Sequence, residues 1–318
     1  MLLIDQQVSQ HIDQNISDGT SMVFQRQLTQ VLARTYDVKY ADLPYRMLFP
    51  VSSEVSEGAN TIEYHVYDQV GVAKLIGAYA KDLPRADVHA KLVQSPVRSS
   101  GVSFGYSTQE IRAAALGNQP LEQRKANATK RANEELFNSI AFDGDSDSGL
   151  PGFLSNPNIT VTTVPNGAGG TPQWTTKTPD EILADINNLF GGIFTLTLMK
   201  ERPNTLLLPP AQWNYISSTP RSSGDSVSIL QWIVMNSPFI SSESDIIPVN
   251  QMTGSGPGST DQMCAYDRNP DAVQAHIPME QKFYAVQIEG LEYTVPSEAR
   301  TGGVIIYYPL SVSLASGI

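Results

Sequence analysis

The sequence predicts an α+β fold built from an extended two-stranded ribbon, a long helix and a compact part in which short helices and strands alternate. Strict alternation of apolar and polar side chains begins at Thr61 and predicts the ribbon. Residues 107–143 carry helical spacing with one interruption, and residues 178–278 mix short helical and strand patterns. No internal repeat is found, so these parts are expected to be structurally distinct.

The composition is that of a soluble globular protein, with 41% hydrophobic and 17% charged residues in a chain of 318. The balance of 21 basic against 32 acidic residues gives a net charge of -11, which argues against wrapping nucleic acid by neutralising phosphates. Cys264 is the only cysteine, which excludes an internal disulfide and predicts a small core residue. The N-terminus lacks the pattern of a signal peptide, and no apolar run approaches the roughly 20 residues of a transmembrane helix.

Residues 61–95 predict the ribbon, which follows an N-terminal arm containing one short helix. Ile62, Tyr64 and Val66 share one face of a strand, and a second extended run covers residues 88–94. Each strand would reach about 35 Å at about 3.3 Å per residue. Because a lone two-stranded ribbon is marginal in water, we expect a neighbouring copy of the chain to support it.

Helix signals follow the ribbon. Ser107 and Glu110 form a capping-box sequence, and helical spacing resumes after Pro120 until Gly144. Asp143, Asp145 and Asp147 then alternate as in a calcium loop, but Ser148 and Leu154 occupy the sixth and twelfth positions, where an EF-hand needs glycine and glutamate. The pattern instead favours a turn in which the aspartates bond to their own backbone and glycines supply positive φ. These glycines are Gly144, Gly149 and Gly152.

The remaining chain predicts a compact α/β part and two final strands. A capping box opens a helix at Thr178, a buried strand covers residues 205–208, and short helices follow near residues 211–216 and 229–235. Another strand is expected at residues 246–249. The alternation in residues 283–295 changes phase at Glu289–Gly290, which predicts a β-bulge, and residues 304–314 predict the last strand.

The best enzymatic signal is the G-x-S-x-G motif of residues 101–105, which would make Ser103 a nucleophile with His276 and Asp261 or Asp271 as partners. However, strand alternation continues through Ser103, and the helix signal begins only at Ser107. The four histidines show no zinc spacing, and the glycine-rich residues 254–258 lack the lysine of a phosphate loop. We therefore expect no enzyme, no cofactor and no dedicated metal site, although a cation at the aspartate turn stays open.

Four segments resemble the major capsid proteins of tailed bacteriophages, whose fold is shared with encapsulin shells. They are residues 80–87 (AKDLPRAD), 96–114 (PVRSSGVSFGYSTQEIRAA), 120–128 (PLEQRKANA) and 140–157, which contain the aspartate turn. The resemblance implies an arm and entry segment (1–60), an extended loop (61–95), a peripheral domain with a spine helix (96–177), an axial domain (178–278) and return strands of the peripheral domain (279–318).

The resemblance also implies a function: copies of the chain assemble into the icosahedral head that encloses a bacteriophage double-stranded DNA genome. It leaves an encapsulin-type shell as an alternative, and scaffolding, portal and decoration proteins as further partners. The expected location is the virion, after synthesis in the bacterial cytoplasm. The residues expected at subunit interfaces are Lys74, Lys81, Asp82, Arg85, Asp87, Asp143, Asp145 and Asp147.

Overall fold

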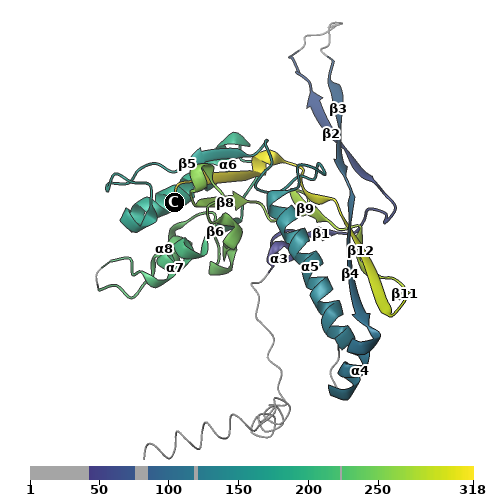
Figure 1. Cartoon of the computed structure of the whole chain (residues 1–318). Helices are drawn as coiled ribbons and strands as arrows, with labels where there is room; N and C mark the ends of the chain where they lie inside the picture. Colours follow the sequence, from purple (N-terminus) through teal and green to yellow (C-terminus); the bar gives the residue numbers. More distant parts are fainter. Residues whose placement is uncertain (1–42, 76–84, 118–120, 223) are drawn as a thin grey trace, which may run out of the picture. The chain divides into compact units, whose positions relative to one another are not determined.

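The structure is a computed structural model that describes residues 43–75, 85–117, 121–222 and 224–318. Its strands form a two-stranded ribbon and sheets of three, four and five strands (Figure 1). The predicted N-terminal arm, which covers residues 1 to about 45, lies almost wholly outside the described residues. In the described part of the chain, no helix is long and apolar enough to cross a membrane.

The ribbon has the predicted position and pairing. β2 (Thr61–Val70) and β3 (Asp87–Pro96) run antiparallel, from the pair Thr61–Pro96 to the pair Val70–Asp87. Figure 1 shows this pair of strands projecting away from the other sheets. The regular register places Ile62, Tyr64 and Val66 on one face, as the sequence alternation predicts.

The four-stranded sheet is organised around β12 (Glu292–Thr301), which pairs along its length with β4 (Arg98–Ser107). On its other side β12 pairs with β10 (Met279–Phe283) and β11 (Gln287–Glu289). The long helix α5 (Leu121–Asp143) packs beside β4, where the Ser100 hydroxyl lies 2.6 Å from Asn133 Oδ1. This helix spans about 35 Å at about 1.5 Å per residue.

The predicted capping box at Ser107 is confirmed. The Ser107 hydroxyl accepts the Glu110 N–H at 3.2 Å, and the Glu110 carboxylate accepts the Ser107 N–H at 3.1 Å. These two bonds satisfy donors that the first turn of α4 (Thr108–Gly117) leaves unpaired. The nearby Lys125 ammonium and the Ser107 N–H hold the pKa of Glu110 below its usual value.

Two sequence predictions about the last strands are wrong. The phase change at Glu289–Gly290 is a hairpin turn, because Glu289 pairs with Glu292 and Gly290 has a φ of 63°. In the sequence alone, two period-two patterns separated by a two-residue turn look like one strand with a bulge. Residues 304–314 likewise form two strands, β13 (Gly303–Ile306) and β14 (Val312–Ser316), which a short 3₁₀ turn at Pro309–Ser311 separates.

These final strands enter different sheets. β13 joins a three-stranded sheet with β9 (Val273–His276) and β1 (Val51–Ser52). β14 lies in the five-stranded sheet, between β5 (Thr160–Thr163) and β8 (Gln262–Tyr266). Residues 279–318 are therefore divided between sheets, and strand pairing does not follow the boundary at residue 278 that the sequence suggested.

The five-stranded sheet is completed by β6 (Thr205–Leu208) and β7 (Ile246–Pro248), and helix α6 (Pro179–Leu196) packs on it. The Thr178 capping box is present, with Pro179 at the first helical position. The shorter helices α7 (Pro210–Ser218) and α8 (Ile229–Asn236) also lie where the sequence predicts them. Their apolar side chains and the buried stripe of α6 share one core, which includes Ile186, Phe190, Leu206, Ile216 and Ile233.

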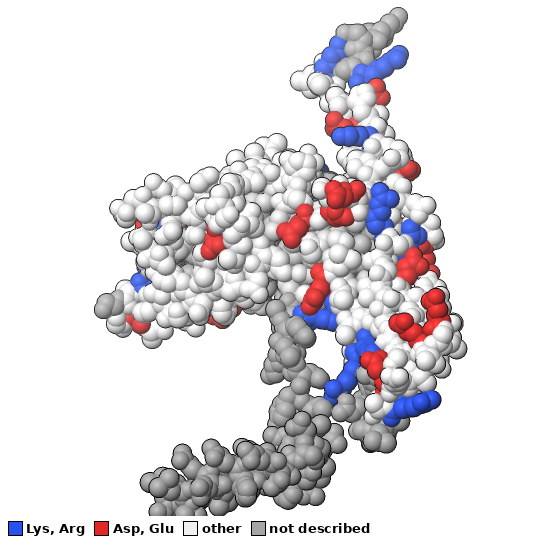
Figure 2. Space-filling model, in the orientation of Figure 1, with Lys and Arg blue, Asp and Glu red and all other residues white. Residues whose placement is uncertain are grey.

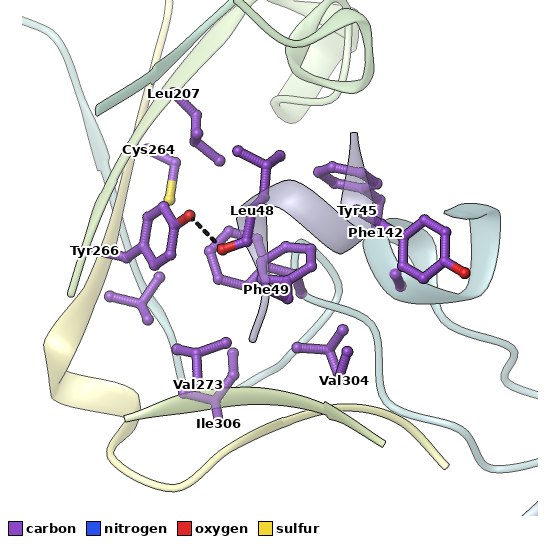
Figure 3. Close-up of a cluster of buried hydrophobic side chains, with 14 of the residues drawn as sticks. Tyr45, Leu48, Phe49, Phe142, Leu207, Cys264, Tyr266, Val273, Val304 and Ile306 are labelled. Carbon is purple, nitrogen blue, oxygen red and sulfur yellow. Dashed lines mark hydrogen bonds between the residues drawn. The ribbon is translucent and has the colours of Figure 1, made fainter. Parts of the chain in front are cut away.

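A second core connects the three- and five-stranded sheets through the short helix α3 (Tyr45–Leu48) (Figure 3). The buried Tyr266 hydroxyl donates to the Leu48 carbonyl at 2.8 Å, which anchors the end of α3 on β8. Phe49 makes ring contacts with Phe142 at the end of α5, at a centroid distance of 5.6 Å. Cys264 is fully buried in this core, as predicted, and burial raises the pKa of its thiol.

Helix α3 is also held by charge. Arg46 makes paired hydrogen bonds to Glu134 on α5 and to Glu280 on β10, and the Tyr45 hydroxyl donates to Glu134 at 2.6 Å. Burial raises the pKa of Glu134, but the hydrogen bonds from Arg46 and Tyr45 outweigh it, so the pKa is lowered overall. A single guanidinium thus joins the entry segment, the long helix and the sheet.

Within the α6 core, Lys177 and Asp185 form a buried ion pair at 2.6 Å, and the Trp174 indole N–H also donates to Asp185. Burial raises the pKa of Asp185 despite these bonds. We expect Asp185→Asn to destabilise the fold by about 3–5 kcal/mol, because it leaves the Lys177 ammonium buried without a counter-charge. Urea unfolding at neutral pH measures this, and Asp180→Asn on the exposed side of the same helix should cost at most about 0.5 kcal/mol. Equal losses in the two variants would contradict the expectation.

Glu134 should make stability depend on acid pH. Because its folded pKa lies below the unfolded value near 4.5, its contribution is complete above that pH and is lost as the pH falls through the folded pKa. Glu134→Gln should lower the free energy of unfolding at neutral pH. It should also make the free energy of unfolding fall less steeply as the pH is lowered. Urea titrations from about pH 7 to about pH 3 test this, with Glu122→Gln on the exposed face of α5 as control. If the free energy of unfolding falls equally with pH in Glu134→Gln and in the unaltered chain, other carboxylates cause the acid sensitivity.

Candidate subunit interface

The outer part of the ribbon exposes apolar side chains on both faces. Tyr67 is 63% exposed on one face, and Val70 is 53% exposed on the other. Beyond the paired strands, Val72 and Leu75 are 75% and 103% exposed. A thin ribbon that buries almost none of these groups against its own globule is poorly stabilised alone. The exposed surface is therefore a candidate contact for another chain.

The foot of the ribbon is fixed to its own subunit by a small core. Ile62 and Val97 pack with Ile305, and the Tyr64 ring meets the Tyr307 ring edge-on at 5.0 Å. The Tyr307 hydroxyl also lies 2.9 Å from His276 Nε2 and donates to Gln274. The ribbon is thus anchored at one end while its outer part stays uncovered.

The predicted interface residues fall in two places. Lys74, Arg85 and Asp87 are exposed on the outer ribbon, and the Asp87 carboxylate accepts the neighbouring Val88 N–H at 2.8 Å. Lys81 and Asp82 lie outside the described residues. Asp143, Asp145 and Asp147 lie in the turn that ends α5, away from this outer part of the ribbon.

The aspartate turn is closed by its own backbone. Asp145 and Leu150 exchange two backbone hydrogen bonds, and the Asp145 carboxylate accepts the Asp147 N–H at 3.3 Å. Gly144 and Gly149 have the predicted positive φ values of 75° and 72°. Gly152 does not; it is needed because a Cβ there would lie 2.2 Å from the Gly144 nitrogen. Among the described residues, no three or more His, Cys, Asp or Glu side chains are grouped to hold a metal ion.

A groove of about 570 Å³ separates the aspartate turn from the ribbon foot. The ribbon contributes Tyr64, Lys91 and Ser95 to its walls, and the turn contributes Gly149 and Pro151. Arg98, at the start of β4, donates to the Ser148 carbonyl and so connects the two segments. Within the described residues, the buried Ser95 hydroxyl has no hydrogen-bond partner.

Ser103 does not form a nucleophile elbow. It lies within β4 opposite Pro296, whereas an elbow needs a sharp turn from strand to helix at the serine. His276 lies in the other, three-stranded sheet; burial lowers its pKa, and its Nε2 is engaged by Tyr307. The geometry therefore contradicts the hydrolase alternative for this motif.

The G-x-S-x-G motif is instead part of a longer row of small side chains along β4. Residues at alternate positions of a strand share a face, and here that face carries glycine and serine throughout. The helix-facing positions of the same strand carry Val102, Phe104 and Tyr106, which explains the alternation. Period two alone was sufficient to find this row, which consists of Ser99, Gly101, Ser103, Gly105 and Ser107.

Charged side chains are distributed unevenly over the face shown in Figure 2. Lysine, arginine, aspartate and glutamate gather over the ribbon, the long helix and the four-stranded sheet, while the part formed by the five-stranded sheet and its helices is mostly uncharged there. The described ribbon residues that the sequence predicts at an interface, Lys74, Arg85 and Asp87, belong to this charged part. Ion pairs between neighbouring chains are therefore available to the ribbon and to the aspartate turn.

Comparisons with known proteins identify the family. A family model for the major capsid protein matches residues 71–318. A search of the curated proteins finds no match. Among solved structures, the capsid of Myoviridae phage XM1 superposes with a TM-score of 0.78 at 18% identity, covering 92% of this chain and 98% of that one.

Two further structures share the fold at greater distance. A structure titled Mycobacterium phage Bobi gives a TM-score of 0.62 at 14% identity, covering 95% of this chain and 98% of that chain. A virus-like particle from Pyrococcus furiosus gives 0.51 at 11% identity, covering 85% and 90% of the two chains. The family model spans most of the sequence and the fold agrees over most of its length: the chain belongs to the major capsid protein family.

Proposed function

We propose that many copies of this protein assemble into the icosahedral head that encloses the double-stranded DNA of a tailed bacteriophage. The observation that carries the proposal is the ribbon, which is anchored at its foot and exposes apolar side chains on both outer faces. In a closed shell each subunit touches several copies, so contacts that are individually weak hold it together. Covering the ribbon would provide one such contact.

The domain roles are part of the same proposal. Residues 61–95 act as the extended loop on a neighbouring subunit, and residues 96–177 form the peripheral domain around α5. Residues 178–278 form the axial domain near five-fold and six-fold axes, and strand β14 supports it by pairing with β8. Residues 1–60 act as arm and entry segment, and the other strands after residue 278 complete the peripheral domain.

The electrostatic balance suits a wall around DNA. With a net charge of -11, the subunit does not neutralise phosphates, so packaged DNA stays free to enter and leave the head. Scaffolding, portal and decoration proteins are further proposed partners. An encapsulin-type shell is a weaker alternative, because the XM1 capsid superposes with a higher TM-score than the Pyrococcus particle.

Shortening the ribbon tests the proposal directly. Val70 and Asp87 are paired, so replacing residues 71–86 with an Asn-Gly turn closes the ribbon without disturbing its remaining ladder. The variant should fold with an unchanged circular dichroism spectrum, because the ladder from Thr61–Pro96 to Val70–Asp87 is kept, but should not form shells. Sedimentation and electron microscopy of the purified protein measure assembly.

Ser103→Ala is the matched control for this experiment, since it changes an exposed side chain far from the ribbon tip. It should assemble as the unaltered chain does. Shells of normal size and yield from the shortened variant would overturn the proposed role of the ribbon.

The aspartate turn is proposed to lie where three subunits meet, with its carboxylates facing basic groups of neighbours or a shared cation. Replacing both Asp145 and Asp147 with asparagine keeps the side-chain oxygens that the turn uses but removes two charges. We expect shells of the double variant to dissociate at lower ionic strength, or to lose their response to added divalent cations. Light scattering during salt and chelator titrations reports both effects.

Asp225→Asn provides the control, because the Asp225 carboxylate accepts a backbone N–H two residues ahead in the same manner. It should leave shell stability unchanged. Identical salt and chelator titrations of the double variant and the unaltered chain would place the aspartate turn outside the contacts.

A further inference from the structure

Helix α6 ends in a backbone conformation that its residues disfavour. Leu198 and Met199 have φ values of 52° and 67°, in the left-handed region that glycine normally occupies after a helix. The Met199 N–H bonds to the Phe194 carbonyl at 2.8 Å and the Leu198 N–H to the Thr195 carbonyl at 3.3 Å, which together form a Schellman motif. A leucine and a methionine therefore stand in consecutive left-handed positions, a strained arrangement that persists only when its surroundings hold it.

The surroundings hold it well. The Thr197 hydroxyl donates to the Ile193 carbonyl at 2.8 Å and accepts the Glu201 N–H at 3.3 Å, and the Lys200 N–H bonds to the Thr197 carbonyl. The turn is thus fixed in place by bonds on both sides of the strained residues. A rigid turn loses little conformational entropy when another surface covers it.

The side chains presented by this turn are apolar and uncovered. Leu198 is 88% exposed, Met199 is 68% exposed, and Leu196 in the last turn of the helix is 55% exposed. The strain brings these side chains no packing within their own subunit. A glycine at Leu198 would end the helix without strain and without an exposed apolar group.

Charge beside the turn indicates what covers it. Lys200 and Arg202 follow on either side of the half-buried Glu201; both are exposed, and neither forms an ion pair with the described residues of its own subunit. Another copy of this chain carries 32 acidic against 21 basic residues, so it offers more carboxylates than cations to Lys200 and Arg202. Apolar side chains followed by two cations therefore suit a neighbouring copy in polarity and in charge.

We propose that residues 196–202 form a rigid contact with a second copy of this chain, in which Leu198 and Met199 pack against the neighbour and Lys200 and Arg202 face its carboxylates. This inference rests on the proposed function, because it needs a lattice of copies. It assigns an interface to the end of α6, which neither the ribbon nor the aspartate turn includes. The contact offsets the free-energy cost of the strained backbone only after assembly.

The proposal predicts that one substitution, Leu198→Gly, stabilises the subunit but weakens its assembly. Leu198→Gly should raise the thermal midpoint of the unassembled full-length subunit by about 2–4 °C, because it relieves the strain. The same change should raise the concentration needed for assembly about tenfold or more, because it removes a buried leucine side chain from the contact. Differential scanning calorimetry measures the first effect, and light scattering with sedimentation measures the second.

Three further variants keep the result interpretable. Asparagine also tolerates the left-handed conformation, so Leu198→Asn should behave like Leu198→Gly. Leu198→Ala keeps the strain and should weaken assembly without stabilising the subunit. Ser259→Gly is the matched control, because Ser259 is an exposed residue with a φ of 57° that carries no apolar group. It should stabilise the subunit and leave assembly unchanged.

The outcomes separate this inference from the proposed function. If the unaltered chain forms no shells, the proposed function fails. If the chain forms shells and all three Leu198 variants assemble at the same concentration as the unaltered chain, the contact is overturned while the function stands. If the Leu198 variants form empty shells normally but package less DNA than the unaltered chain, the contact is also overturned, since the turn would then face the packaged DNA.

Discussion

A two-stranded ribbon has two faces and no second layer to cover either, and this constraint governs the rest of the structure. Each strand of β2 and β3 finds its backbone partner in the other, but beyond Val66 the side chains of β2 are largely uncovered by the described residues of their own subunit. Hydrogen bonding therefore defines the shape of the ribbon without supplying the apolar burial that stabilises folded chains. Such an element becomes advantageous when other copies of the chain provide the missing layer.

The globular part is arranged to hold the foot of that ribbon rigidly. Tyr64 packs on Tyr307, and the β-sheet that carries Tyr307 is joined through α3 to both the long helix and β8. Arg46 adds ionic bonds between α3, α5 and β10, where partial burial strengthens charge-assisted hydrogen bonds. The foot of the ribbon is thereby attached to packed side chains of its own subunit.

Two consecutive strands near the end of the chain enter different sheets. β13 and β14 are separated by only a short turn at Pro309, yet one enters the three-stranded sheet and the other the five-stranded sheet. The turn joins the two sheets covalently, and Ile306 and Val312 on either side of it lie in the same core. The three- and five-stranded sheets are therefore coupled more closely than a division at residue 278 suggests.

Local patterns in the sequence were sufficient for the elements whose signals are local. Both capping boxes, the long helix to Gly144, the ribbon strands and the buried strand at Leu206 follow from hydrogen-bonding side chains and apolar spacing within a few residues. Tertiary structure decided what depends on distant partners. The hairpin at Gly290, the split of residues 304–314 and the Arg46 cluster are fixed by pairing across the chain, which periodicity does not encode. The strained turn at Leu198 is the extreme case, because nothing in its residue types favours a left-handed backbone, and only the surrounding hydrogen bonds impose it.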